Sequence, residues 1–160
     1  MEYSRHDFIG DFAKRTLKNL DFIQAEAAAS GVYPVTQLWN SLLGLIVLPS
    51  EADLESLQIP MSDLWSDGWP HITTTGRERE VLRDLMVDLR NAVAHFNVEF
   101  VPGTDREIKT VTVWTRRSNR EGKPIEGTRR WEGKLTVKQL DHLARRIAAI
   151  YVKEFAHTSV

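Results

Sequence analysis

The fold is decided by residues 82–96, whose sequence is LRDLMVDLRNAVAHF. Apolar side chains recur here every three or four residues, which is the spacing of one face of an α-helix. The members of this apolar stripe are Leu82, Leu85, Leu89, Ala92, Val93 and Phe96. The pattern predicts a helix over residues 77–96 that packs the stripe against a core.

Three further helices are predicted around this one, over residues 4–29, 35–48 and 136–155. The first and the last begin with residues spaced as in a capping box, where two side chains three positions apart cap the helix N-terminus. The second is apolar on nearly every side, so we expect it at the buried centre of the domain.

The stretch before the last helix, about residues 97–135, follows a different period. Strands are expected around residues 98–100, 108–114 and 126–135, because β-branched and aromatic residues are concentrated there. Residues 122–124, Gly-Lys-Pro, indicate a turn. The stretch therefore predicts a β-hairpin or a small antiparallel sheet inserted between two helices.

The connection over residues 49–76 is long, and such connections are uncommon unless they are functional or packed by their own side chains. One short helix is expected within it, at residues 51–57. Trp65 and Trp69 are expected to be buried anchors of this segment. A cleft in which these rings stack on bases is the alternative.

Composition favours one mainly α domain over residues 1–160, a length that suffices to bury a core. The absence of cysteine excludes disulfides and thiolate metal sites. The N-terminus is charged, unlike a signal peptide. The most apolar stretch, residues 42–48, is too short to cross a bilayer. We therefore expect a cytoplasmic protein without a membrane partner.

Charge is unevenly distributed along the chain, although its net value is only -1. Residues 106–134 hold nine Lys or Arg against four Glu. The basic residues are Arg106, Lys109, Arg116, Arg117, Arg120, Lys123, Arg129, Arg130 and Lys134. A local basic surface fits a polyanion partner such as RNA. A solvated hairpin rich in Lys and Arg is the alternative.

Three residues at the end of the decisive helix carry chemistry: Arg90, Asn91 and His95. A guanidinium binds phosphate oxygens with its planar fork of donors, and an imidazole moves a proton near neutral pH. Together these groups are the minimum parts for phosphodiester cleavage without a metal. For Arg90 the residues alone leave open a surface ion pair with Asp84 or Asp88. For His95 they leave open a structural place at the helix C-terminus, where the dipole favours it.

The helical geometry bears on how these groups meet. At roughly 100° per residue, Arg90 and His95 lie about 140° apart, at the two edges of the polar face. Val87 lies between them. An apolar side chain in the middle of a polar face predicts a cover, and the simplest cover is the same helix of a second copy. In such a dimer both sets of groups share one cleft.

The pattern Arg90-Asn91-x-x-x-His95 at the end of the third long helix resembles the ribonuclease signature of the HEPN superfamily (higher eukaryotes and prokaryotes nucleotide-binding). Residues 42–49, LLGLIVLP, and 89–97, LRNAVAHFN, are similar to a bacterial, plasmid- or phage-associated subgroup of HEPN nucleases. The resemblance covers the helical core, and the β insertion is less characteristic of the superfamily.

The resemblance implies a metal-independent endoribonuclease that needs no cofactor and acts as a homodimer through the helix carrying Arg90 and His95. In that mechanism the 2′-hydroxyl of the RNA attacks the adjacent phosphate. His95 would carry the proton, Arg90 would clamp the phosphate, and Asn91 would position one of them. A catalytically silent HEPN dimer that binds a nucleotide or a partner is the alternative. DNA binding through the basic hairpin is a third possibility.

Three further arginines are expected to bind the substrate. Arg116 and Arg117 stand on the basic hairpin, and Arg83 precedes Arg90 by seven residues on the same helix edge. No metal site is expected, because the chain has no His-x-x-x-His pair. The family resemblance further suggests a toxin–antitoxin or phage-defence setting, with a possible antitoxin as partner.

Overall fold

The computed structural model describes residues 5–30, 34–76, 79–104 and 107–155. The chain divides into two compact units, residues 1–49 with 140–160, and residues 50–139. We describe each unit by itself. None of the helices in the described part of the chain is long and apolar enough to cross a membrane.

The first unit contains three long helices, α1 (Arg5–Ser30), α2 (Pro34–Val47) and most of α6 (Val137–Phe155). α1 packs on α2 at Gly44, where an added Cβ would lie 2.5 Å from the ring of Phe12. The guanidinium of Arg145 on α6 binds the carboxylates of Asp141 and Asp21, which ties α6 to α1. The apolar face of α6 is buried at Leu140, Leu143, Ala144, Ile147, Ala148, Tyr151 and Phe155.

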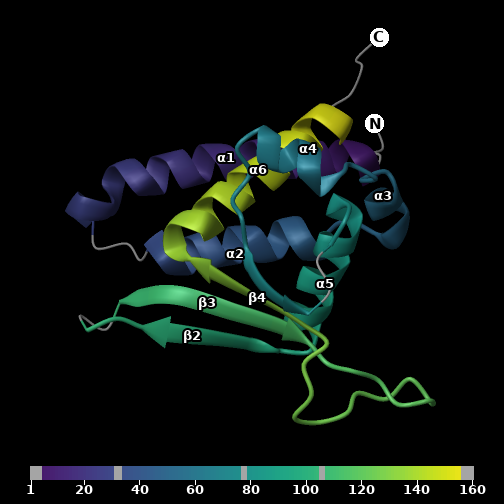
Figure 1. The fold of residues 1–160 in the computed structure, drawn as a ribbon. Coiled ribbons are helices and arrows are strands. Elements are labelled where there is room, and N and C mark those ends of the chain that lie inside the picture. Colours follow the sequence, from purple (N-terminus) through teal and green to yellow (C-terminus); the bar gives the residue numbers. More distant parts are fainter. Residues whose placement is uncertain (1–4, 31–33, 77–78, 105–106, 156–160) are drawn as a thin grey trace. The chain divides into compact units, whose positions relative to one another are not determined.

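The second unit is a four-stranded antiparallel sheet with short helices around it (Figure 1). Its helices are α3 (Glu51–Glu55), α4 (Met61–Ser66) and α5 (Leu82–Ala94). Its strands are β1 (Thr73–Gly76), β2 (Val98–Pro102), β3 (Ile108–Thr115) and β4 (Trp131–Thr136), in the order β1-β4-β3-β2. α5 packs against β3. Trp131 is fully buried in the core of this unit.

The expectation of a mainly α chain with a small antiparallel sheet before the last helix is confirmed. The capping box of the last helix is also present. The amide of Gln139 donates to Thr136 Oγ1 at 3.2 Å, and the amide of Thr136 donates to Gln139 Oε1 at 2.8 Å. Trp69 is buried, as expected of an anchor. Trp65 stacks on His71 with ring centroids 5.0 Å apart.

The predicted start of the decisive helix was wrong, because α5 begins at Leu82 rather than five residues earlier. The preceding residue, Val81, has extended backbone angles. The amide of Leu82 donates to the carbonyl of Ile59 at 2.9 Å, and the amide of Met61 donates to the carbonyl of Glu80 at 2.8 Å. These bonds hold the segment extended beside residues 59–61. Residues 77–78 lie outside the described residues.

The long connection before α5 contains more structure than the single short helix that we expected. It forms α3, α4 and the strand β1, which pairs with β4 from Thr73↔Lys134 to Gly76↔Trp131. Gly76 has φ +93, and an added Cβ would lie 2.5 Å from the carbonyl oxygen of Arg130. A run of three threonines gave no alternation from which this edge strand could be recognised.

Candidate functional site

The end of α5 is fixed by a Schellman motif, in which two amides beyond the helix bond back to its last turn. The amide of Phe96 donates to the carbonyl of Val93 at 3.0 Å. The amide of Asn97 donates to the carbonyl of Ala92 at 2.8 Å. His95 is the C-cap residue and directly precedes Phe96. Its backbone is therefore held at both sides while its side chain is exposed.

Phe96 occupies the left-handed position of this motif, with φ +53. Glycine is usual there because a Cβ is strained in this conformation. The ring is 83 % exposed, so the expectation that Phe96 belongs to the buried stripe was wrong. The helix ends before Phe96, so the regular advance of side chains around the axis no longer applies to it.

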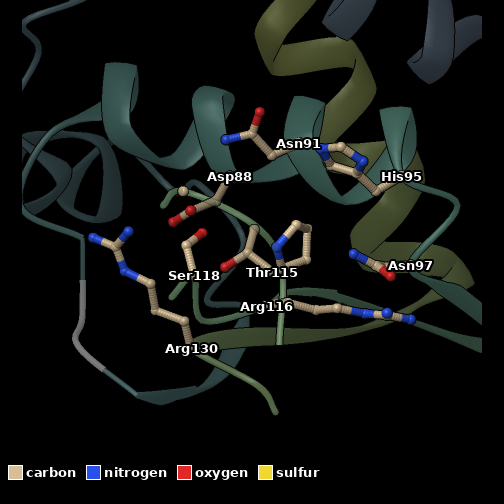
Figure 2. Close-up of a pocket in the computed structure, with 10 residues that line it drawn as sticks. Asp88, Asn91, His95, Asn97, Thr115, Arg116, Ser118 and Arg130 are labelled. Atoms are coloured by element: carbon tan, nitrogen blue, oxygen red, sulfur yellow. The ribbon is translucent and has the colours of Figure 1, made fainter. Parts of the chain in front are cut away.

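A pocket of about 370 Å³ opens beside this helix end (Figure 2). Its lining residues come from α5, from the residue that precedes β2, from the end of β3 and from the β3–β4 loop. They are Asp88, Asn91, His95, Asn97, Thr115, Arg116, Ser118, Gly122, Pro124 and Arg130. All of them belong to the second unit. The volume lies in the usual range of small-ligand sites.

The β3–β4 loop, residues 116–130, forms one wall of the pocket and is held by its own hydrogen bonds. Asn119 Oδ1 accepts the amides of Glu121 at 3.0 Å and Lys123 at 2.8 Å. Gly122 has φ +79, in agreement with the expected turn. The third expected strand begins later than residue 126, because β4 starts at Trp131.

Asn91 and His95 project from α5 beside one another, and both line the pocket (Figure 2). Arg116 lines it from the loop, 3.8 Å from the carboxylate of Glu126. Arg90 is half-buried and is not among the lining residues, as its place on the opposite edge of the polar face of α5 implies. The chain by itself therefore brings three of the six predicted site residues to one pocket.

The other two predicted arginines lie elsewhere. Arg83 donates to Glu55 Oε1 at 2.6 Å and to Asp84 Oδ1 at 3.2 Å, which ties α5 to α3. Arg117 is exposed in the β3–β4 loop, and its amide donates to Thr128 Oγ1 at 3.2 Å. Neither residue lines the pocket.

Asp88 is the acidic residue of the pocket, and burial raises the pKa of its carboxyl above the ordinary value. Its hydrogen bond to Arg79 Nε, the charge of Arg79 and the charge of Arg130 favour the ionised form and oppose this shift of the pKa. The sequence left open an ion pair between Asp88 and Arg90, whereas Arg79 is the arginine bonded to this carboxylate. Of the loop arginines, Arg130 acts on this carboxylate through its charge alone.

Five polar lining residues were not among the predicted site residues: Asp88, Asn97, Thr115, Ser118 and Arg130. Asn97 is 3 % exposed and Thr115 is 8 % exposed, and the hydroxyl of Thr115 has no hydrogen-bond partner among the described residues. Asn97 lies beside the end of β3 because Val98 pairs with Val113, and Arg130 lies beside Thr115 because the last pair between β3 and β4 joins Thr115 to Trp131. That register was not readable across an intervening loop of this length.

The pocket has the groups for acid–base chemistry on a phosphate: an imidazole, amides, hydroxyls and two guanidiniums. Among the described residues, no three His, Cys, Asp or Glu side chains gather as a metal ion would require. A family model described as HEPN pEK499 p136 matches residues 1–158. No curated protein and no solved structure gives a match.

Proposed function

The chain belongs to the HEPN family described as pEK499 p136, and from that membership we propose that it is a metal-independent endoribonuclease. The observation that carries the proposal is the pocket at the end of α5, which is lined by Asn91, His95 and Arg116. An imidazole and a guanidinium that line one pocket suit proton transfer at a phosphodiester.

The proposed reaction uses the 2′-hydroxyl of the RNA as its nucleophile. The O2′–P bond forms, the P–O5′ bond breaks, and the products are a 2′,3′-cyclic phosphate and a 5′-hydroxyl. His95 carries a proton of this exchange, from O2′ as a base or to O5′ as an acid. Asn91, one helical turn away, positions the imidazole or a phosphate oxygen. Arginine donors stabilise the negative charge that grows on the phosphorane oxygens.

Arg90 enters this mechanism from a second copy of the chain. Arg90 does not line the pocket of its own subunit, and Val87 lies between it and His95 on the face of α5. If two α5 helices pack across a two-fold axis, each Arg90 comes near the His95 of the other copy. We therefore propose a homodimer through α5, with Arg90 as the phosphate clamp.

Arg116 and Arg117 are proposed to hold the flanking RNA by phosphate contacts. Arg83 can extend this surface only by giving up its bond to Glu55 or to Asp84. The proposed setting is a cytoplasmic toxin–antitoxin or phage-defence system, in which an antitoxin is a candidate partner. This setting follows from family analogy and from no residue of the site.

The test is cleavage of labelled single-stranded RNA by purified wild type and by His95→Ala, both in excess chelator. Cyclic-phosphate ends from wild type alone are the expected result. A strict requirement for a divalent ion would contradict the metal-free mechanism. Equal cleavage by His95→Ala would remove His95 from the reaction.

A binding module without catalysis is the second candidate, and the character of the pocket favours it. The pocket is polar and has the volume of a small-ligand site. The buried hydroxyl of Thr115 has no hydrogen-bond partner among the described residues. In this alternative the dimer binds a nucleotide or a partner and leaves RNA intact. Saturable nucleotide binding with no cleavage of RNA would select it.

A further inference from the structure

We propose that Arg130 is a phosphate-binding residue of this pocket, so that an RNA strand crosses the pocket between the β3–β4 loop and α5 of one subunit. The inference rests on the proposed ribonuclease function and adds a residue outside the Arg90–His95 motif. It assigns part of the RNA contact to the sheet rather than to the helix.

The backbone of Arg130 is fixed from two sides. Its amide donates to the carbonyl of Thr115 at 2.8 Å, directly beside the last pair of β3 and β4. Its carbonyl oxygen lies against Gly76 of β1, where an added Cβ would approach it to 2.5 Å. The guanidinium therefore extends from a rigid point at the end of the sheet, although it belongs to an exposed residue.

The charge of Arg130 is available to a ligand. Asp88 is the acidic side chain of the pocket, and its carboxylate is already bonded by Arg79. Arg130 acts on Asp88 only as a nearby charge, and among the described residues it forms no ion pair of its own. Arg116 is a second lining guanidinium, and its ion pair with the exposed carboxylate of Glu126, at 3.8 Å, is weakened by solvent. The pocket therefore carries positive charge in excess, which suits an anion.

One polar group that lines the pocket also lacks a hydrogen-bond partner among the described residues. The hydroxyl of Thr115 is buried and forms no hydrogen bond within the described part of the chain, although a buried polar group without a hydrogen-bond partner is unfavourable. Figure 2 shows Thr115 in the middle of the labelled side chains. Phosphate oxygens and ribose hydroxyls are the groups of RNA that supply acceptors and donors of this kind.

The side chains of Arg116 and Arg130 point in different directions (Figure 2). Figure 2 shows the guanidiniums of Arg130 and Arg116 on opposite sides of the pocket, with Asn91 and His95 above the space between them. Groups placed in this way fit two phosphates along one strand better than one phosphate held by both. We therefore assign Arg130 to a phosphate that flanks the one beside His95.

The experiment measures the affinity of a short single-stranded 2′-fluoro RNA over a series of salt concentrations. This probe lacks the attacking hydroxyl and stays intact. Arg130→Gln is expected to raise Kd about tenfold at low salt, as one charge-assisted contact is lost. The slope of log Kd against log salt is expected to fall by about 0.7, the value for one phosphate of a single strand.

Arg129→Gln is the matched control, because Arg129 precedes Arg130 and does not line the pocket. Its guanidinium bonds Glu132 and lies 4.3 Å from the ring centroid of Trp114. This variant is expected to keep the wild-type Kd and slope. Arg130→Lys keeps the charge, so it is expected to keep the slope.

A wild-type slope and Kd for Arg130→Gln would overturn the inference. Equal losses in Arg129→Gln and Arg130→Gln would also overturn it, since they would indicate a general charge effect. Cleavage of ordinary RNA is measured in parallel. Cleavage by wild type with unaltered binding by Arg130→Gln removes this inference alone. Absence of both binding and cleavage in wild type removes the proposed function as well.

Discussion

Thr115 places a hydroxyl among apolar side chains of the core. Val111 and Val113 precede it on β3 and are buried. Thr115 continues this buried row with a hydroxyl that has no hydrogen-bond partner in the part of the chain that the structure describes. An apolar residue of the same shape would suit the free protein better. Retention of a hydroxyl at such a position is understandable if a ligand supplies its partner.

Thr115→Val is therefore expected to stabilise the free protein and to weaken RNA binding. Removal of an unsatisfied buried hydroxyl is worth about 1 kcal/mol in the free energy of unfolding. The melting temperature should rise by about 2–4 °C. Thermal melting and the affinity for 2′-fluoro RNA check the two effects, with Thr115→Ser as the control that keeps the hydroxyl. A lower melting temperature would indicate a structural hydrogen bond instead.

At the scale of elements, sequence periodicity predicts the middle of α5 correctly and both of its ends wrongly. The buried residues Leu85, Leu89 and Ala92 follow the helical spacing. The start was misplaced because extended pairing with residues 59–61 competes with helix formation there. The end was misplaced because Phe96 takes a left-handed conformation that a sequence reader expects of glycine.

Some residues of the candidate site are predictable from local spacing, and the others depend on long-range pairing. Asn91 and His95 are one turn apart, so their common location on α5 follows from local spacing alone. The approach of Asn97 to Thr115 depends on the β2–β3 register, and that of Arg130 depends on the β3–β4 register and on the loop between β3 and β4. Such long-range pairing is not encoded in any short stretch of sequence, so those contacts needed the structure.

The order of the β3–β4 loop is expected to matter for RNA binding. Asn119→Ala removes the side-chain oxygen that accepts the amides of Glu121 and Lys123. The loop arginines then lose their fixed positions, and Kd for 2′-fluoro RNA should rise several-fold, as for other ordering costs of about 1 kcal/mol. Asn119→Ser keeps an acceptor oxygen without adding a charge and serves as the control. Unchanged binding by Asn119→Ala would mean that this wall does not contact RNA.

In the whole molecule, the proposed active site is built either by one chain or by two. Arg116 and Arg130 share a pocket with His95 in one chain, whereas Arg90 does not line that pocket. The proposed dimer therefore combines a pocket in one subunit with Arg90 from the other. The family match covers residues 1–158 and specifies neither a dimer nor the residues at its interface.

Complementation separates these arrangements. Arg90→Ala and His95→Ala are each expected to abolish cleavage and to keep the fold, because neither side chain is part of the buried core. After the two variants are mixed and their subunits exchange, about a quarter of wild-type activity should return, since half of the dimers hold one intact site. Val87→Asp should weaken the dimer in sedimentation. No recovery in a mixture that has exchanged subunits would place both groups in one subunit.

The central claim is that His95 carries a proton in RNA cleavage that needs no metal. Wild type and His95→Ala are incubated with end-labelled single-stranded RNA in excess chelator, and the product ends are analysed. We expect 2′,3′-cyclic phosphate and 5′-hydroxyl ends from wild type and none from His95→Ala. Cleavage by both proteins, or cleavage that stops in chelator, would contradict it.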